Sequence, residues 1–402
     1  MAESTATYLG LGYIGLPTAI LTAKNGIKTL GYDIDSQKID SIVEGNLFTK
    51  EPGLKDELKS VLESGSLSIS TSLEIANTYV VVVPTPLISQ NLPDISIVKD
   101  AINSIIPLLK KGDLVIIEST CPVLTTEKMS DLIFLNRPEL ENSIYLAYCP
   151  ERVLPGNILN ELVNNDRIVG GINKESSLKA KSFYQNFVQG EIHITNARTA
   201  EMCKLTENSA RDAQIAFANE LSMICDEAEI NVWELIKLAN KHPRVNILNP
   251  GIGVGGHCIA VDPWFLVADF PDEAKLIKHV RETNKFKTKW CANKIASAAN
   301  KYFDLNKTMP KIACMGLSYK PNVDDLRESP AIEIVNFLNN QGFDLVIVEP
   351  NVISSSIYKI ESIQNALNIA SIVVWLVAHD EFKNVEMPEN IIEIDLCGLS
   401  EK

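Results

Sequence analysis

Short apolar stretches rich in β-branched residues alternate with longer helical patterns from the start of the chain to about residue 195. Clear examples of the short stretches lie at residues 79–83, 114–117 and 144–148, and each is followed within a few positions by Pro or Ser. Because a parallel strand needs a crossover helix to return to the same edge of a sheet, this alternation predicts βαβ units and a parallel sheet.

A different pattern occupies the middle of the chain. Residues 199–229 contain neither Gly nor Pro, and their apolar positions recur at helical spacing, which predicts one long helix. Residues 242–263 are rich in Gly and Pro and too irregular for a helix or a strand, and a second helical run is expected at 272–303. After Lys307 the α/β alternation resumes. The expected elements there are strands at 311–316, 344–348, 372–377 and 391–396 and a helix at 330–340.

Length and charge limit the classes of protein to consider. A chain of 402 residues exceeds what one hydrophobic core usually supports, so two or three domains are expected. The net charge of −14 argues against a protein that binds nucleic acid or an anionic membrane. Apolar runs such as residues 372–378 are about a third of a membrane span, and no signal-peptide pattern opens the chain.

The cysteines and histidines predict neither a disulfide framework nor a metal site. The 8 cysteines are scattered without any C-x-x-C pair, and the 5 histidines have no metal-ligand spacing with them. We therefore expect a reduced, cytoplasmic protein without a metal.

Gly10, Gly12 and Gly15 form the pattern G-x-G-x-x-G ahead of a predicted helix at 16–25. The first glycine permits a tight turn, the second lets backbone amides approach a pyrophosphate, and the third lets helix and strand pack closely. Asp33 follows a second predicted strand, at the offset of a carboxylate that binds a ribose 2′-hydroxyl. A carboxylate there would repel a 2′-phosphate, so the pattern favours NAD over NADP. The glycines alone also fit an ordinary tight turn, and the strand expected at 5–9 is less apolar than a buried parallel strand usually is.

Cys258 follows the glycine-rich run GIGVGGH at residues 251–257. Such a run leaves room for a ligand and can turn amides toward an anion, and a cysteine at its end can be exposed and activated. If the next residues are helical, Asp262 shares the face of Cys258. A small buried cysteine is the alternative. We prefer that alternative for Cys203, Cys225, Cys291, Cys314 and Cys397, and leave Cys121 and Cys149 undecided.

Four polar residues of the predicted long helix share one face, because they are spaced by three or four positions. These are Glu201, Lys204, Asn208 and Arg211. A solvated charged stripe with a Glu201–Lys204 surface pair is one interpretation. The other is a functional stripe that converges on the glycine run, where a lysine can lower a thiol pKa or stabilise an oxyanion. Position alone does not decide between them.

Two further loops have chemistry suited to a ligand. Glu151 and Arg152 follow a predicted strand, the place where α/β sheets bind ligands. His242 and Arg244 lie in a rigid basic loop that suits a carboxylate or phosphate. A loop of either kind, taken by itself, is more often a connection without a functional role. The occurrence of both loops together with the glycine pattern and Cys258 favours a role in ligand binding.

Together these motifs resemble the UDP-glucose/GDP-mannose dehydrogenase family, from Gly10 into the C-terminal region. The matching strings are residues 10–17, 83–86, 118–120, 149–156, 198–208, 242–249, 253–265 and 319–329. The resemblance implies an N-terminal Rossmann domain at 1–197 that binds NAD, a central helical domain at 198–305 with one long helix, and a C-terminal Rossmann-like domain at 306–402 that binds the UDP-sugar. It also implies a homodimer through the central helix, in which Arg244 reaches the neighbouring subunit's site.

The strings at 242–245 and 253–265 favour the N-acetylmannosamine branch of the family. The implied activity is a four-electron oxidation of the C6 hydroxyl of UDP-N-acetyl-D-mannosamine to the uronate, a precursor of surface polysaccharide. Cys258 would form a thiohemiacetal and then a thioester. Lys204 with Asn208 would stabilise the oxyanion or relay protons, Asp262 would orient water or act as a base, and Glu151 would assist thioester hydrolysis through water.

The resemblance also implies two sets of binding residues. Substrate contacts are expected from Arg152, Val153, Lys204, Asn208, Arg211, His242, Arg244, Gly255 and Lys320. NAD contacts are expected from Gly10, Gly12, Tyr13, Ile14, Gly15, Asp33, Thr85, Thr120 and Arg327.

Two positions depart from the family pattern, and two other functions remain open. Pro155 stands where many UDP-glucose enzymes have a second acid, which again favours the N-acetylhexosamine branch, and Cys121 replaces a small or apolar residue without a functional explanation. The same chemistry on UDP-glucose, UDP-N-acetylglucosamine or UDP-N-acetylgalactosamine is one alternative. A catalytically silent NAD-binding protein with Cys258 as a redox sensor is the other, although a sensor needs the thiol and not the proton-handling residues.

Overall fold

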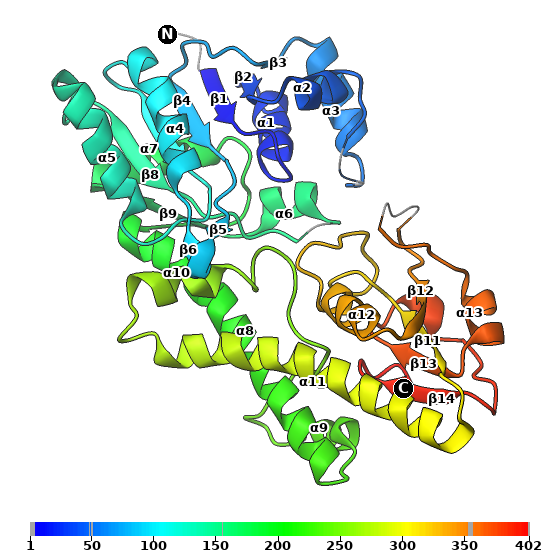
Figure 1. The fold of residues 1–402 in the computed structure, drawn as a ribbon. Coiled ribbons are helices and arrows are strands. Elements are labelled where there is room, and N and C mark those ends of the chain that lie inside the picture. Colours follow the sequence, from blue (N-terminus) through cyan, green and yellow to red (C-terminus); the bar gives the residue numbers. More distant parts are fainter. Residues whose placement is uncertain (1–4, 48, 50, 155, 353–356, 401–402) are drawn as a thin grey trace. The chain divides into compact units, whose positions relative to one another are not determined.

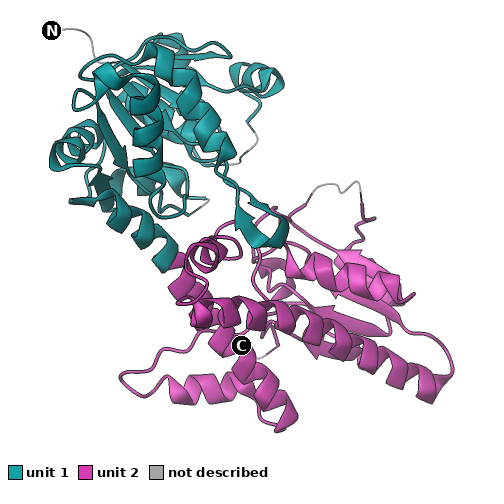
Figure 2. Ribbon diagram, turned by 60° about the vertical axis from the view of Figure 1, so that its left-hand side comes forward, with its two compact units in different colours: residues 1–206 teal, residues 207–402 magenta. Residues whose placement is uncertain are grey.

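The computed structural model describes residues 5–47, 49, 51–154, 156–352 and 357–400, so Pro155 lies outside the described residues. The chain divides into two compact units, Met1–Thr206 and Glu207–Lys402 (Figure 2). The three-domain division expected from the sequence stays a prediction. No helix in the described ranges is both long enough and apolar enough to cross a membrane.

The N-terminal unit is built on a sheet in which eight described strands have the order β10-β9-β8-β7-β4-β1-β2-β3 (Figure 1). The strands are β1 Thr5–Leu9, β2 Lys28–Tyr32, β3 Leu67–Ser70, β4 Thr78–Val81, β7 Leu114–Ile117, β8 Tyr145–Tyr148, β9 Arg167–Gly171 and β10 Ile192–Asn196. A separate small hairpin pairs β5 Leu87–Ile88 with β6 Leu92–Pro93. The helices are α1 Gly15–Lys24, α2 Ser36–Val43, α3 Leu54–Glu63, α4 Ser96–Ile105, α5 Thr125–Asn136, α6 Ile158–Asn164 and α7 Lys174–Tyr184.

Two apolar layers cover the faces of this sheet. One layer includes buried side chains of α1, α3, α6 and α7, and the other includes those of α4 and α5. Successive residues of β1 belong to opposite layers, as strand geometry requires: Tyr8 packs in the first and Leu9 in the second. Although β1 contains two threonines, Thr7 is buried and the Tyr8 hydroxyl shares a 2.7 Å hydrogen bond with Thr22. The polar atoms of this strand are therefore accommodated inside the core.

β9 and β10 are the exceptions to the expected parallel sheet: β9 pairs antiparallel with β8, and β10 pairs parallel with β9, so both run opposite to the other six strands. The connection between these strands contains only the seven-residue helix α6 and does not cross back to the far edge. β9 therefore starts at the edge where β8 ends, with Tyr148 opposite Gly170. This reversal brings the start of β9 beside the loop that follows β8.

The expected long helix is present as α8, Ala197–Glu227, two residues earlier than predicted. It ends before Glu229, whose φ of 56° is a left-handed conformation that stops an α-helix. The second helical run is α11, Lys275–Asn306, and Lys307 at φ 56° ends it in the same way. Two shorter helices, α9 Val232–Ala239 and α10 Asp262–Asp269, lie between them in sequence.

The C-terminal unit contains a four-stranded parallel sheet of order β12-β11-β13-β14 within the described residues. Its elements are β11 Lys311–Met315, α12 Pro330–Asn340, β12 Asp344–Val348, α13 Ile363–Ile369, β13 Ile372–Trp375 and β14 Ile392–Asp395. Side chains of α11 and α12 cover one face and those of α13 the other. The fold class expected from the sequence, α/β with a long central helix and a C-terminal parallel sheet, is confirmed.

A buried polar network joins α8 to α11 in the C-terminal unit. The Arg281 guanidinium donates a 2.7 Å hydrogen bond to Asp212, which also accepts one of 2.7 Å from Asn284. The Asn219 side-chain amide donates to Oδ1 of Asn284 at 2.9 Å, and Oδ1 of Asn219 accepts from the Gly251 amide. These side chains are almost inaccessible to solvent, so each charge depends on its partner for compensation.

We expect Arg281→Met to lower the free energy of unfolding by about 3–5 kcal/mol, because the carboxylate of Asp212 would stay buried without its cation. Urea denaturation followed by circular dichroism measures the change. Arg198→Met is the matched control, since Arg198 makes a bidentate pair with Glu127 at the surface and its loss should change stability little. Equal small losses for both variants would contradict the structural role assigned to the buried pair.

Candidate active site

Four of the predicted cofactor residues lie where neighbouring parallel strands end. Gly10 follows β1, Asp33 follows β2, Thr85 lies beyond β4 and Thr120 beyond β7. These strands are adjacent in the order β7-β4-β1-β2, and all their pairings are parallel, so their carboxyl ends share one edge. The strand order reverses at β1, and an open α/β sheet binds its ligand outside such a reversal.

The glycines at this edge have different spatial constraints. A Cβ on Gly15 would lie 1.9 Å from the Gly10 carbonyl oxygen, and Gly10 itself has φ of 100° with Val82 in close contact. Around Gly12, in contrast, the described residues leave the Cβ position open within 4 Å. The first turn of α1 contains no acidic residue, so its positive end suits a pyrophosphate. Tyr13 and Ile14 connect the glycines to α1 and are exposed and half-buried, respectively.

Asp33 is held in one orientation before any cofactor is bound. Its carboxylate accepts hydrogen bonds from the Leu11 amide at 2.9 Å, the Asp35 amide at 3.1 Å and the Lys38 ammonium at 2.8 Å. Burial by itself would raise the pKa of Asp33, but the hydrogen bonds from Lys38, Leu11 and Asp35 outweigh it and lower the pKa. Lys38, five positions after Asp33 and in the first turn of α2, was not among the residues predicted from the sequence.

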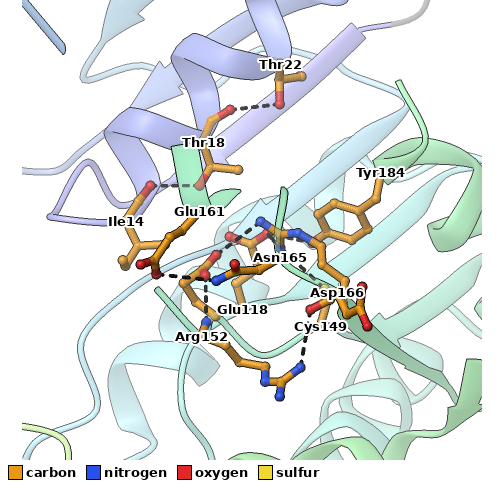
Figure 3. Close-up of polar contacts among 12 residues, drawn as sticks. Ile14, Thr18, Thr22, Glu118, Cys149, Arg152, Glu161, Asn165, Asp166 and Tyr184 are labelled. Carbon is orange, nitrogen blue, oxygen red and sulfur yellow. Dashed lines mark hydrogen bonds and ion pairs between the residues drawn. The ribbon is translucent and has the colours of Figure 1, made fainter. Parts of the chain in front are cut away.

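The loop after β8 brings three predicted site residues together. The Lys204 ammonium of α8 donates to the backbone carbonyl of Glu151 at 2.7 Å. The Glu151 carboxylate accepts from the Arg152 amide at 2.6 Å and from the Arg167 guanidinium at 3.2 Å. The Arg152 side chain donates to the carbonyl of Asp166 at 3.2 Å (Figure 3), and Val153 is half-buried against the apolar core.

Glu201 does not belong to a solvated stripe, contrary to the simplest interpretation of the helix face. It is fully buried and accepts hydrogen bonds from the amides of Leu124 and Thr126 and from the Thr126 hydroxyl, each at 2.7 Å. A carboxylate at the N-terminus of α5 is favourable because it meets unpaired amides and the positive end of the helix. Arg211, in contrast, is exposed.

Cys258 and Asp262 are joined by one helical turn, as expected. The Cys258 carbonyl accepts from the Asp262 amide at 2.8 Å, and Asp262 is the first residue of α10. The Asp262 carboxylate is buried and accepts a 2.5 Å hydrogen bond from the Asn208 amide group. Asn208, Cys258 and Asp262 therefore lie close together, with the Cys258 side chain exposed.

The glycine run before Cys258 lies against the segment after β11. A Cβ on Gly255 would lie 2.4 Å from the Glu328 carbonyl oxygen, and one on Gly256 would lie 2.9 Å from the Tyr319 ring. The Gly256 amide also donates to the Arg327 carbonyl at 3.2 Å. A side chain at these glycines would separate two loops that both contain predicted site residues, which explains the absence of side chains there.

The other predicted residues of the C-terminal unit lie in exposed or half-buried loops. Arg327 makes a bidentate pair with Asp325 at 2.9 and 2.7 Å, and Lys320 is half-buried with its ammonium 5.7 Å from the Tyr319 ring centroid. His242 and Arg244 are exposed after α9. The binding roles of these residues stay predictions.

The loop that contains Lys320 is supported by two buried residues, Glu349 and His379, that were not predicted from the sequence. The Glu349 carboxylate accepts from the amides of Leu317 and Ser318 at 2.7 and 2.9 Å. His379 is fully buried, lies 3.2 Å from the same carboxylate, and its Nδ1 accepts from the Asn322 amide at 3.0 Å. Glu349 and His379 each follow a predicted strand, which is the signal that could have identified them.

Accessibility separates Cys258 from the other cysteines. Cys121, Cys149, Cys225, Cys291 and Cys314 are buried, and Cys203 and Cys397 are half-buried. Burial raises the pKa of Cys314 to about 12 and that of Cys291 to about 11, so those thiols stay protonated and unreactive. Cys258 alone among the eight cysteines is exposed.

Three domain models of one protein family match most of the chain. Residues 4–188 match the NAD binding domain of the UDP-glucose/GDP-mannose dehydrogenase family, residues 198–286 its central domain, and residues 313–396 its UDP binding domain. The chain belongs to this family. NAD as the cofactor and a UDP-sugar as the substrate are confirmed at this level, and the chain is an NAD-dependent UDP-sugar dehydrogenase.

Individual relatives are similar over nearly their full length. The NDP-N-acetyl-D-galactosaminuronic acid dehydrogenase of Ralstonia nicotianae is 48% identical over 98% of this chain and 96% of its own. The UDP-N-acetyl-D-mannosamine dehydrogenase of Escherichia coli K12 is 46% identical over 95% of each chain. The solved UDP-D-ManNAc dehydrogenase of Pyrococcus horikoshii is 37% identical, with a TM-score of 0.89 over 98% of this chain and 99% of its own.

The glycine geometry predicts different effects for two substitutions of the same kind. Gly15→Ala should destabilise the fold by about 1–3 kcal/mol, because its methyl group would collide with the Gly10 carbonyl. Gly12→Ala should leave stability nearly unchanged but weaken NAD binding by about tenfold or more, because the methyl group occupies space that a pyrophosphate needs. Urea denaturation and calorimetric NAD titration measure the two effects. A stable Gly15→Ala protein, or unaltered NAD affinity in Gly12→Ala, would show that the glycine has another role.

A second carboxylate of the N-terminal unit has an unusual protonation equilibrium. Glu118 follows β7 and is buried, and burial raises its pKa from an ordinary value of 4.5 to about 7. Arg167 and the hydrogen bond from Tyr184 oppose this rise, while Glu151 adds to it. Between pH 4.5 and 7 the folded state therefore binds more protons than the unfolded state, and stability falls as the pH rises through this window.

We expect Glu118→Gln to remove this component of the pH dependence, which is on the order of 3 kcal/mol between pH 4.5 and 8. Urea denaturation of the variant and the unsubstituted protein at pH 5, 6, 7 and 8 gives the difference in slope. Glu141→Gln, at an exposed glutamate of the same unit, is the control and should leave the slope unchanged. Parallel pH profiles for Glu118→Gln and the unsubstituted protein would contradict the raised pKa.

Proposed function

We propose that this protein oxidises the C6 hydroxyl of UDP-N-acetyl-D-mannosamine to the carboxylate, with Cys258 as the covalent nucleophile. The observation that carries the proposal is the group formed by an exposed Cys258, a buried Asp262 one turn later, and Asn208 bonded to that carboxylate. The similarity to the Escherichia coli relative supports this choice of sugar. The product would serve as a precursor of surface polysaccharide.

The reaction removes four electrons from one carbon in two stages. NAD supplies the hydride acceptor at each stage, and one proton leaves with each hydride. The aldehyde formed first adds the Cys258 thiol to give a thiohemiacetal, which loses the second hydride to become a thioester. Water then cleaves the thioester to release the carboxylate and restore the thiol. Overall, the alcohol, two NAD⁺ and water give the carboxylate, two NADH and three protons.

The chain's own residues supply the remaining chemistry. In this proposal Lys204 stabilises the oxyanion or relays protons with Asn208, and Asp262 orients water or acts as the base near Cys258. Glu151 assists thioester hydrolysis through a water molecule. Two observations support this role for Glu151. Both oxygens of its carboxylate accept hydrogen bonds, and its backbone carbonyl accepts a hydrogen bond from Lys204.

Binding residues follow the same proposal. The substrate contacts are Arg152, Val153, Lys204, Asn208, Arg211, His242, Arg244, Gly255 and Lys320, and the NAD contacts are Gly10, Gly12, Tyr13, Ile14, Gly15, Asp33, Thr85, Thr120 and Arg327. We further propose domains at 1–197, 198–305 and 306–402, a homodimer through the central helix, and a cytoplasmic location.

UDP-N-acetyl-D-galactosamine is the second candidate substrate. The specific observation in its favour is the 48% identity to the Ralstonia nicotianae relative, which is named for N-acetyl-D-galactosaminuronic acid. The chemistry at the C6 carbon would be the same. The two sugars differ in the orientation of ring substituents, so the decision rests on the pocket around the sugar.

The test is NADH release by the purified protein over UDP-N-acetyl-D-mannosamine, UDP-N-acetyl-D-galactosamine, UDP-N-acetyl-D-glucosamine and UDP-glucose. We expect two NADH per sugar, the highest kcat/KM with the first substrate, and acid formation lost in Cys258→Ala because no thioester can form. Cys203→Ala is the matched control, since Cys203 is half-buried and has no role in the proposal.

Each alternative has a distinct result in this experiment. Preference for another sugar would replace the substrate and keep the chemistry. One NADH per sugar with free aldehyde, or unchanged turnover in Cys258→Ala, would remove the covalent mechanism. Release of no NADH from any sugar, with Cys258 reversibly oxidised by peroxide, would favour the redox-sensor alternative.

A further inference from the structure

Arg167, which belongs to none of the sequence motifs, is the centre of a buried polar cluster in the N-terminal unit. Its guanidinium donates to the Glu151 carboxylate at 3.2 Å and to the Cys149 sulfur at 3.6 Å, and it lies 3.7 Å from Glu118. Tyr184 donates a 2.6 Å hydrogen bond to Glu118 (Figure 3), and its ring centroid is 4.7 Å from the guanidinium carbon. The Arg167 side chain is only 4% exposed.

The antiparallel pairing of β9 with β8 creates this contact. Tyr148 lies opposite Gly170, and extension of the same register by three residues places Glu151 opposite Arg167. A parallel β9 would begin at the far edge of the sheet, away from the loop after β8. The reversed direction of β9 therefore places the Arg167 guanidinium beside the Glu151 carboxylate.

The composition of the cluster differs from that of an ordinary structural ion pair. One guanidinium faces two carboxylates, and Oε2 of Glu118 and Nε of Arg167 have no hydrogen-bond partner among the described residues. The Arg281–Asp212 network also contains buried atoms that are unpaired within the described part of the chain, Oδ2 of Asp212 and Nε of Arg281, so the presence of two carboxylates, and not the unpaired atoms, distinguishes the Arg167 cluster. In contrast, the Glu151 oxygens are both satisfied, one by Arg152 and one by Arg167.

We infer that Arg167 is a positioning residue that holds the Glu151 carboxylate for thioester hydrolysis, with Tyr184 and Glu118 fixing the guanidinium in turn. The inference rests on the proposed function. The Glu151 side chain is 11% exposed, so one carboxylate reaches the surface of the cluster while the guanidinium beneath it stays buried. A cation behind the carboxylate fixes its direction without occupying the side that water approaches. Arg167 acts through Glu151 and does not itself meet the substrate.

The test compares Arg167→Met, Glu151→Gln and the double variant, with the UDP-sugar that gives the highest NADH yield in the panel above. Each should release the first burst of NADH normally, while steady-state turnover falls on the order of 10- to 100-fold because the hydrolytic carboxylate is misplaced or absent. Mass spectrometry of acid-quenched protein should show an acyl group on Cys258. Because Arg167 acts through Glu151, the double variant should be about as slow as Glu151→Gln alone.

Two further variants separate positioning from folding. Arg167→Lys keeps the buried positive charge with a single nitrogen, and should fold while still accumulating the acyl group. Arg137→Met removes an arginine of the same unit that donates to the carbonyls of Ile106 and Leu109, and should leave turnover unchanged.

The outcomes distinguish the inference from the proposed function. Accumulation of the acyl group in Glu151→Gln but in neither Arg167 variant would overturn the positioning role and leave the proposed function intact. Multiplicative losses in the double variant would also overturn it, because they indicate independent effects. Absence of an acyl group on Cys258 in every variant, Glu151→Gln included, would overturn the proposed mechanism together with the inference.

Discussion

The close approach of α1 to β1 depends on the missing side chain of Gly15. Only a residue without a Cβ allows the helix to start directly above the Gly10 carbonyl, at the edge where four neighbouring strands end. The positive end of the helix and the carboxylate of Asp33 then lie on the same edge, with the Leu11 amide hydrogen-bonded to that carboxylate. The cofactor chemistry of the N-terminal unit therefore follows from one backbone contact.

Each unit also contains a buried arginine, and the two differ in a way that matters for function. Arg281 faces Asp212 within a chain of amide side chains that ties α8, α11 and the start of the glycine run together, which suits a scaffold. Arg167 faces two carboxylates, and one of those carboxylates is partly exposed. The two arginines are therefore similarly buried but differ in the number and exposure of the carboxylates that they face.

The strands and long helices were predictable from sequence, because burial on both faces imposes apolar runs and the lack of Gly and Pro over residues 199–229 leaves a helix uninterrupted. The antiparallel direction of β9 was not predictable from sequence, because the direction of a strand depends on the path of its connection and not on its own residues. Glu201 shows the same limit. Its spacing on the helix face was correct, but its role as the acceptor for α5 amides depends on a helix 75 positions earlier in the chain.

The candidate site shows a similar division. Cys258, Asp262 and Asn208 were expected together, and the helical turn after His257 brings the first two into one local structure that sequence spacing describes well. Arg167, Lys38 and the Glu349–His379 pair were missed because they support other residues and form no contiguous motif. Residues that hold a functional side chain in place are recognisable only when the contacts that they make are known.

The three hydrogen bonds on Asp33 have a consequence for redesign of cofactor preference. Removal of that carboxylate would eliminate repulsion of a 2′-phosphate and release the Lys38 ammonium to meet it, yet it would also leave the Leu11 amide without its acceptor beside the glycine turn. A change toward NADP therefore calls for a small polar replacement that still accepts from this amide. Asp33 therefore supports the backbone of the glycine turn in addition to the ribose selection proposed for it.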